Sequence, residues 1–168
     1  MSRELTTQSE ETMKFKGQKV QPPKPEMIVL PRGENNEDAL VFYAGAILNF
    51  DEFDRICPQP LPTKKVYPGG KVVDDFESEE YKTRINAHLE KRFHWLVLTS
   101  LKSTPDLEWE TVDHLNPDTW ANYEKELAES MTKAEITSVQ MGVMNANSMN
   151  EERQRQARSF FQRTPAQQ

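Results

Sequence analysis

The chain has 168 residues, of which 36% are hydrophobic and 29% are charged, and its mean hydropathy is -0.80. Average proteins are about 45–50% apolar on a count that includes glycine, so the composition predicts a small core with long polar appendages. No apolar run approaches the roughly 20 residues that cross a bilayer, and the N-terminus lacks the apolar segment of a secretory signal. We therefore expect no membrane partner.

Charge and cysteine content narrow the expected setting further. Lys and Arg number 21 against 27 Asp and Glu, which gives a net charge of -6. Proteins that neutralise nucleic-acid phosphates usually carry a basic face or a high isoelectric point, so we expect no nucleic-acid partner. Cys57 is the single cysteine; it cannot form an internal disulfide, which fits a reducing cytoplasm.

Residues 1–25 are polar and end in a proline-rich stretch, which predicts an arm that is either disordered or loosely docked. In residues 26–57, two apolar runs (27–30 and 39–48) flank turn-forming residues. They predict a β-hairpin or two successive strands, although residues 44–48 could equally open a helix. Asn49 as N-cap and Glu52 three positions later predict a short helix, which carries Phe50, Phe53 and Ile56 on one face.

Residues 58–76 form a connector in which prolines and the Gly69-Gly70 pair recur. Proline lacks the backbone donor that a helix needs, so we expect an extended segment with a turn at 68–71. Connectors of this length are usually either binding surfaces or disordered segments.

Residues 77–163 have helical periodicity. An apolar stripe recurs every three or four residues, and residues 93–98 are apolar nearly all round, which predicts a central buried helix. The stripe consists of Tyr81, Ile85, Leu89, Phe93 and Leu96.

Three helix starts follow that central helix. Asn116 is a predicted N-cap with Pro117 at the first position, and Trp120, Tyr123 and Leu127 form the inward stripe of its helix. Capping boxes are predicted at 132–135 and 148–151; their helices carry the apolar residues Ile136, Val139 and Val143, and Ala157, Phe160 and Phe161. A tail, 164–168, completes the chain. The predicted fold is mainly α: about four to five helices, with an N-terminal β-hairpin or short strands and a proline-rich connector.

The search for catalytic chemistry yields no assembled motif. His88 and His94 are six residues apart, about 120° from each other around a helix, so they do not form a metal-binding pair. The acidic run 51–54 lacks the spacing of a calcium loop, and residues 68–71 are too short for a phosphate-binding loop. Cys57 lies between Ile56 and Pro58, which suggests packing. We expect a non-enzymatic protein without a cofactor or metal.

Several helical segments carry a family likeness: LEWETV at 107–112, NPDTW at 116–120, YEKEL at 123–127, Thr132 with Glu135 and Ile136, GVMNANSM at 142–149 and ARSFF at 157–161. With these motifs, residues 80–163 resemble tail assembly chaperones of long-tailed bacteriophages. The resemblance implies a helper in the host cytoplasm that binds the tape measure protein, recruits tail tube protein and is absent from the mature virion. It also implies weak self-association.

A carrier of apolar helices needs adaptable apolar surfaces, and methionine suits them because its side chain is flexible and polarizable. The candidate partner-binding residues are Met131, Met141, Met144, Met149, Phe160 and Phe161. The alternative for the methionines is that they fill an irregular core, and Trp109 and Trp120 are expected to be core anchors. Two other functions stay open: a structural virion component or head–tail adaptor, and a small regulatory protein that binds a host target.

Overall fold

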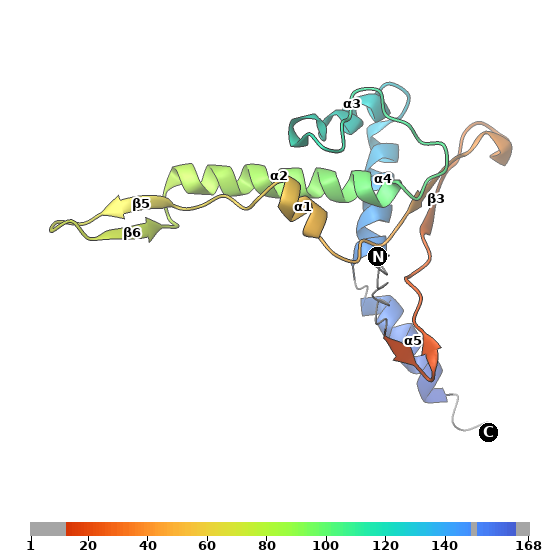
Figure 1. Cartoon of the computed structure of the whole chain (residues 1–168). Helices are drawn as coiled ribbons and strands as arrows, with labels where there is room; N and C mark the ends of the chain where they lie inside the picture. Colours follow the sequence, from red (N-terminus) through yellow and green to blue (C-terminus); the bar gives the residue numbers. More distant parts are fainter. Residues whose placement is uncertain (1–12, 149–150, 164–168) are drawn as a thin grey trace, which may run out of the picture.

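The computed structural model describes residues 13–148 and 151–163 (Figure 1). Its α-helices are α1 (Asp51–Ile56), α2 (Glu79–Leu101), α3 (Asn122–Ala128), α4 (Lys133–Asn147) and α5 (Glu151–Arg163), with short 3-10 helices η1 (Asn36–Asp38) and η2 (Pro117–Thr119). Its strands are β1 (Lys14–Phe15), β2 (Gln18–Lys19), β3 (Glu26–Leu30), β4 (Leu40–Ala44), β5 (Thr63–Val66) and β6 (Val72–Asp75). They form three antiparallel two-stranded sheets among the described residues. The fold is therefore mixed α/β. The described residues have five α-helices, as expected, but three small sheets, so the expected description as mainly α fits only in part.

The β3–β4 hairpin supplies one wall of the core. The predicted hairpin is confirmed, with Ile28 opposite Phe42 and Leu30 opposite Leu40, although β4 ends at Ala44 and residues 45–50 form no helix. Burial alternates along β3, because successive side chains point to opposite faces of a strand: Ile28 and Leu30 are buried, whereas Met27 and Val29 are exposed. The buried face packs against α4 and the last turns of α2.

The β3–β4 hairpin and helices α1 to α4 form the packed body of the chain, and the core contains side chains from each of them. Phe53 of α1 is fully buried, with its ring 5.6 Å from that of Trp95 and 6.1 Å from that of Trp120 between centroids. Rings at these separations attract each other beyond the area that they bury. The other buried apolar residues include Val97, Leu98, Leu101, Tyr123, Leu127, Val139 and Val143. The predicted inward stripes of α3 and α4 are thus confirmed, as is the Trp120 anchor, while Trp109 is partly buried against the core.

Two close contacts fix α4 on the hairpin and on α2. A Cβ placed on Gly142 would lie 2.3 Å from Cδ1 of Ile28, so only glycine allows this approach of α4 to β3. At the end of α4, Asn147 accepts a hydrogen bond from the Ile47 amide (2.7 Å) and donates to the Gly45 carbonyl oxygen (3.3 Å). The Gly45 carbonyl also accepts from the Ser100 hydroxyl at 2.7 Å. These contacts join β4, α2 and α4.

Of the three predicted helix N-caps that lie in the described residues, two are confirmed. Thr132 and Glu135 form the reciprocal capping box at the start of α4, and the Asn116 side chain accepts a hydrogen bond from the Asp118 amide. Asn49 is not the N-cap of α1: the helix begins one residue later, after Phe50, and Asn49 accepts from the Asp51 amide instead. The predicted second capping box includes residues 149–150, which lie outside the described residues.

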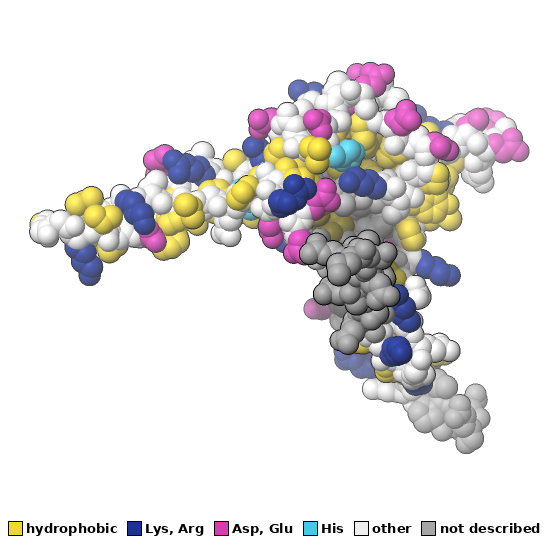
Figure 2. Space-filling view, in the orientation of Figure 1, with side chains coloured by type: hydrophobic (Ala, Val, Ile, Leu, Met, Phe, Trp, Pro, Cys, Tyr) yellow, Lys and Arg dark blue, Asp and Glu magenta, His cyan; other side chains and the backbone are white. Residues whose placement is uncertain are grey.

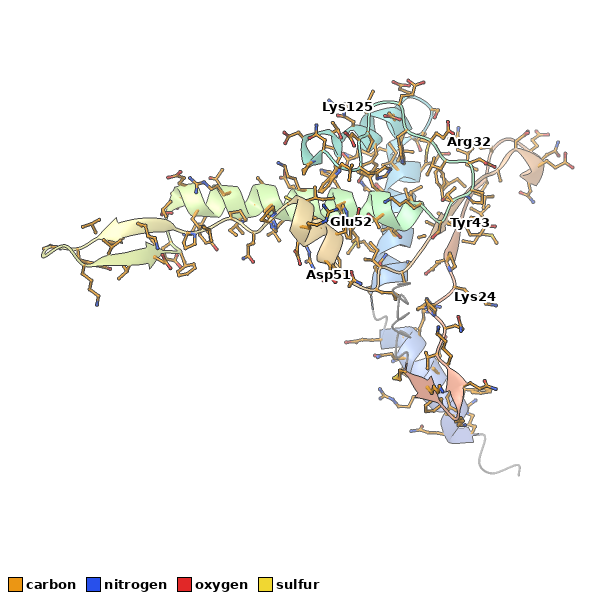
Figure 3. The ribbon with its side chains drawn as sticks, in the orientation of Figure 1. Lys24, Arg32, Tyr43, Asp51, Glu52 and Lys125 are labelled. Carbon is orange, nitrogen blue, oxygen red and sulfur yellow. The ribbon has the colours of Figure 1, made fainter. Side chains whose placement is uncertain are left out.

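The hairpin side of the body also has polar attachments (Figure 3). Arg32 donates to the Ser130 carbonyl oxygen at 2.9 Å and lies 3.1 Å from a carboxylate oxygen of Glu135. The Tyr43 amide donates to the Thr104 hydroxyl at 2.8 Å, and that hydroxyl donates back to the Tyr43 carbonyl oxygen. These bonds tie the hairpin to the start of α4 and to the segment after α2.

Two parts of the chain project from this body. The first half of α2 extends outward to the β5–β6 hairpin, and α5 leaves in a different direction (Figure 1). The connector is non-helical as expected, with its turn around Gly69 and Gly70, but its strands pair with each other from Thr63–Asp75 to Val66–Val72. Of the predicted arm, residues 13–25 are exposed, and in the described part of the chain β1 pairs with β2 and with no other strand.

Candidate protein-binding surface

An apolar stripe runs along α2, from its projecting first half into the half that packs against the core. We use the name α2 stripe for Tyr81, Ile85, Leu89, Phe93 and Leu96, which the sequence analysis placed on one face. Ser78 caps the helix, since its hydroxyl accepts a hydrogen bond from the Tyr81 amide at 3.2 Å. Leu89 remains 52% exposed, and the other four are only partly buried. Figure 2 shows hydrophobic side chains at the surface of this projection. The stripe is therefore less covered than a core stripe.

A small groove lies where the α2 stripe meets the body. It encloses about 190 Å³, and most of its lining is apolar. The lining residues are Phe50, Leu89, Arg92, Phe93, Leu96 and Met144. We call it the α2 groove. Its residues come from the start of α1, from α2 and from α4, so the groove exists only when these three elements are packed together.

Arg92 gives the α2 groove a positive rim. Its guanidinium lies over the Phe50 ring, 4.3 Å from the centroid, and Phe50 in turn contacts Trp95 with 5.4 Å between ring centroids. The cation–π contact orients the guanidinium and leaves its donors at the surface, where they can bind a carboxylate. The groove thus combines an apolar floor with one fixed cation.

The structure separates the predicted partner-binding residues. Met131 is buried, which agrees with the alternative that it fills the core. Met141 and Met144 are 59% and 44% exposed, and Met144 alone of the predicted set lines the α2 groove. Phe160 and Phe161 are exposed on α5. Met149 lies outside the described residues.

A second hollow, between α3 and α4, is lined in part by Met131 and Ile136 and encloses about 440 Å³. Its rim is held by hydrogen bonds of Gln140, which donates to the Tyr123 hydroxyl and to Glu124, each at 3.0 Å. Burial raises the pKa of Tyr123, so this hydroxyl stays protonated at neutral pH. The hollow is broader than the α2 groove, and the Gln140 amide and the Glu124 carboxylate on its rim already bond within the chain.

The three histidines and Cys57 are partly buried against other residues of the chain. His88 forms a 3.0 Å hydrogen bond with the Cys57 carbonyl oxygen, and the His94 ring packs against Tyr123. Burial lowers the pKa of His114 and raises the pKa of the Cys57 thiol. Across residues 13–148 and 151–163, no cluster of three or more His, Cys, Asp or Glu side chains could hold a metal ion.

Five groove residues were missed as binding residues in the sequence analysis. Phe50 was placed with Phe53 and Ile56 on one face of the short helix. Leu89, Phe93 and Leu96 were placed in the apolar stripe of the predicted central helix. Arg92 was not singled out, although on a helical projection it falls among the stripe residues, about 60° from Leu89. A long cation inside an apolar sector is a signal that this sector reaches the surface, because arginine keeps its charged end in water.

Comparison of the chain with protein-family models, curated proteins and solved structures gave no match. Within the described part of the chain, no helix is both long and apolar enough to span a membrane.

Proposed function

We propose that this protein is a non-enzymatic tail assembly chaperone of a long-tailed bacteriophage and that it binds helical segments of the tape measure protein. The observation that carries the proposal is the α2 groove with the exposed half of the α2 stripe beside it. The resemblance of residues 80–163 to tail assembly chaperones is the reason for naming the tape measure protein as the bound partner, or client. The groove supports the proposal because its apolar lining and its cation suit an amphipathic helix.

The client segment is an amphipathic helix. A helix of this kind lays its apolar face along a groove and is held by anchors spaced three or four residues apart. Leu89, Phe93 and Met144 would receive its apolar side chains, and Arg92 would pair with a carboxylate one turn from the anchor. A pair of this kind fixes the register of the helix in the groove more than it adds affinity.

Each such contact is small, because the groove encloses only about 190 Å³. Stable protein interfaces bury about 1,600 Å², so one copy would hold its segment weakly. A long repetitive client that binds many copies gains from multivalency only if the copies are linked or neighbouring. We propose this mode of action for the host cytoplasm during assembly, with tail tube protein as the second partner.

The test is co-expression with a helical fragment of the tape measure protein, which is encoded by the very long gene expected downstream. Leu89→Glu places a carboxylate in the groove, and we expect it to abolish solubilisation of the fragment. Ala87→Glu is the matched control: Ala87 is exposed on the opposite face of α2, about 160° from Leu89, and it should solubilise like the wild type. If the wild-type chain leaves the fragment insoluble at equimolar expression, the proposal fails.

A structural role in the virion is the second candidate, and the β5–β6 hairpin favours it. Among the described residues, each of its strands pairs on one side only, and exposed edges are templates for pairing with another chain. Mass spectrometry of purified particles separates the two functions: a chaperone is absent from the particles, whereas a structural component or head–tail adaptor is present in stoichiometric amounts.

A regulatory role is the third. A single host protein that comes down stoichiometrically from uninfected lysate, and is lost with Leu89→Glu, would favour a regulator over a chaperone.

A further inference from the structure

The charge of the chain is unevenly distributed. Residues 26–148, which contain the body and the β5–β6 hairpin, have 12 Lys and Arg against 22 Asp and Glu, a net charge of -10. Residues 13–25 of the arm have four lysines and no acidic residue, and α5 has four arginines against two glutamates, so these two segments together carry +6. Residues 1–12, outside the described part, add -2. We use the name basic limb for residues 13–25 and α5.

The two segments of the basic limb meet the rest of the chain at the same place. Arg153 of α5 lies 3.6 Å from Glu26, the residue at which the arm joins β3, and both segments extend from there in the same direction (Figure 1). In Figure 2, Lys and Arg side chains lie along this limb, whereas the acidic side chains in view lie mainly over the body. The expectation of no nucleic-acid partner rested on the net charge of the whole chain, and the limb has the opposite sign.

Most cations of the limb have no carboxylate partner. Arg153 and Arg155 each pair with a glutamate, and the Lys16 ammonium lies over the Phe15 ring, 5.7 Å from its centroid. In the described part of the chain, no ion pair involves the other five cations, which are Lys14, Lys19, Lys24, Arg158 and Arg163. The limb therefore presents a positive surface that an external anion can neutralise.

The β1–β2 hairpin places two of these lysines directly opposite each other. Lys14 and Lys19 are cross-strand partners, so their side chains point to the same face of the hairpin. Like charges in this position destabilise a pair of strands, and residues 13–25 contain no carboxylate that could offset them. An anion bound between the two ammonium groups would replace this repulsion by attraction. The pair therefore suits a phosphate group.

An exposed aromatic ring lies beside the lysine pair. Phe15 follows Lys14 in β1, stands opposite Gln18 and is 67% exposed. Proteins that bind single-stranded nucleic acid combine cations that contact the phosphates with aromatic rings on which the bases stack. A flexible strand also carries its charges along an extended backbone, so it can contact cations on two elements. An acidic protein segment would use the lysines but would leave the ring without a partner.

We propose that the basic limb binds single-stranded nucleic acid, with Lys14 and Lys19 on phosphates and Phe15 stacked on a base. The limb does not distinguish sequences, because charges and a ring contact features that all nucleotides share. This activity goes beyond the proposed function and uses no residue of the α2 groove.

Fluorescence anisotropy of labelled oligothymidylate and oligouridylate, each of about 16 nucleotides, titrated with the full chain, tests the proposal. If about four cations contact phosphates, binding of both strands should weaken about 50-fold when salt rises from about 50 to 200 mM. Lys14→Glu with Lys19→Glu removes two of these contacts. It should weaken binding at the lower salt by roughly 50-fold, and the remaining salt effect should be about sevenfold.

Phe15→Ala tests the stacking contact separately. It should weaken binding by about 5- to 100-fold and leave the salt dependence unchanged, because no charge is removed. The matched control for the lysine variant is Lys65→Glu with Lys71→Glu, at exposed positions of the β5–β6 hairpin. It makes the same change in net charge outside the limb and should bind like the wild type.

Other partners give other results, and each would overturn the proposal. Polyglutamate that binds as tightly as oligothymidylate, with no effect of Phe15→Ala, would indicate an acidic protein partner. Binding to phosphatidylserine vesicles without binding to either oligonucleotide would indicate a lipid surface. A mass that rises at low salt in sedimentation velocity without oligonucleotide, and is restored by the Lys14 and Lys19 substitutions, would indicate a second copy of the chain. Equal losses in the lysine variant and its control would show that net charge alone governs binding.

Discussion

The contact between Gly142 and Ile28 gives a sharp test of how α4 is held on the β3–β4 hairpin. In Gly142→Ala the new Cβ would lie 2.3 Å from Cδ1 and 2.4 Å from Cγ1 of Ile28. Alanine is favoured over glycine inside a helix by about 1 kcal/mol, but overpacking a core costs about 1–3 kcal/mol. Ile28 is only 8% exposed and stands on a paired strand, so it has little room to move. The overpacking cost should therefore lie in the upper part of its range, about 2–3 kcal/mol, which leaves a net loss of about 1–2 kcal/mol.

The same substitution should have the opposite sign when Ile28 is truncated. Ile28→Ala alone removes a buried side chain and costs about 2–5 kcal/mol. It also removes the two atoms that the new methyl group would meet, so adding Gly142→Ala should then restore about 1 kcal/mol through helix propensity. The expected coupling energy is about 2–3 kcal/mol, larger than the few tenths found for independent sites.

The measurement is equilibrium unfolding in urea of the four proteins of this double-mutant cycle, followed by far-ultraviolet circular dichroism. An equal change in unfolding free energy on Gly142→Ala in both backgrounds would refute the reasoning, because the clash with Ile28 could not then be its cause. A Gly142→Ala variant that is more stable than the wild type would show that helix propensity outweighs packing here.

Three further predictions concern other contacts. Phe53→Ala should cost about 3–5 kcal/mol in urea unfolding, because the ring is fully buried; a loss below about 1 kcal/mol would contradict that burial. Desolvation opposes ionisation of Glu126, but hydrogen bonds from the Thr111 hydroxyl and from backbone amides keep its pKa below the usual range. Its ionised form therefore contributes stability above the unfolded pKa of about 4.3, which is lost as pH falls through the folded pKa. The protection factor of the Thr111 amide against hydrogen exchange should fall over that pH range, and Glu126→Gln should remove most of this change. Burial raises the pKa of Cys57, so at pH 7.5 it should react with Ellman's reagent more slowly than free cysteine; urea should remove the difference.

Local signals in the sequence were sufficient for much of the helical body. The Thr132–Glu135 capping box, the Asn116 cap and the Trp120, Tyr123 and Leu127 stripe depend on residues three or four apart, and the structure has all three. The β5–β6 pairing was not predicted. Its strand residues are mostly polar and exposed, so hydrophobic alternation, the signal of a half-buried strand, is weak there.

The α2 groove was beyond sequence reasoning for a different reason. The periodicity of α2 shows that Leu89 and Phe93 share a face, but it does not show whether another element covers that face. Whether a side chain on that face is covered depends on where α1 and α4 pack. The predictions failed in both directions: Met131, predicted to bind a partner, is buried, whereas Leu89, predicted to be buried, is half exposed. Phe50 and Met144, which complete the groove, are nearly a hundred positions apart and are joined only by the tertiary fold.

The bond between Ile47 and Asn147 spans 100 residues of sequence, and this span has a consequence during translation. At about 5–20 residues per second, the ribosome needs roughly 5–20 s to synthesise the stretch between the two partners. Throughout that interval the apolar face of the β3–β4 hairpin has no α4 to cover it. A nascent chain that stops before α4 would therefore expose Ile28 and Phe42, and such fragments should be the aggregation-prone products of incomplete synthesis.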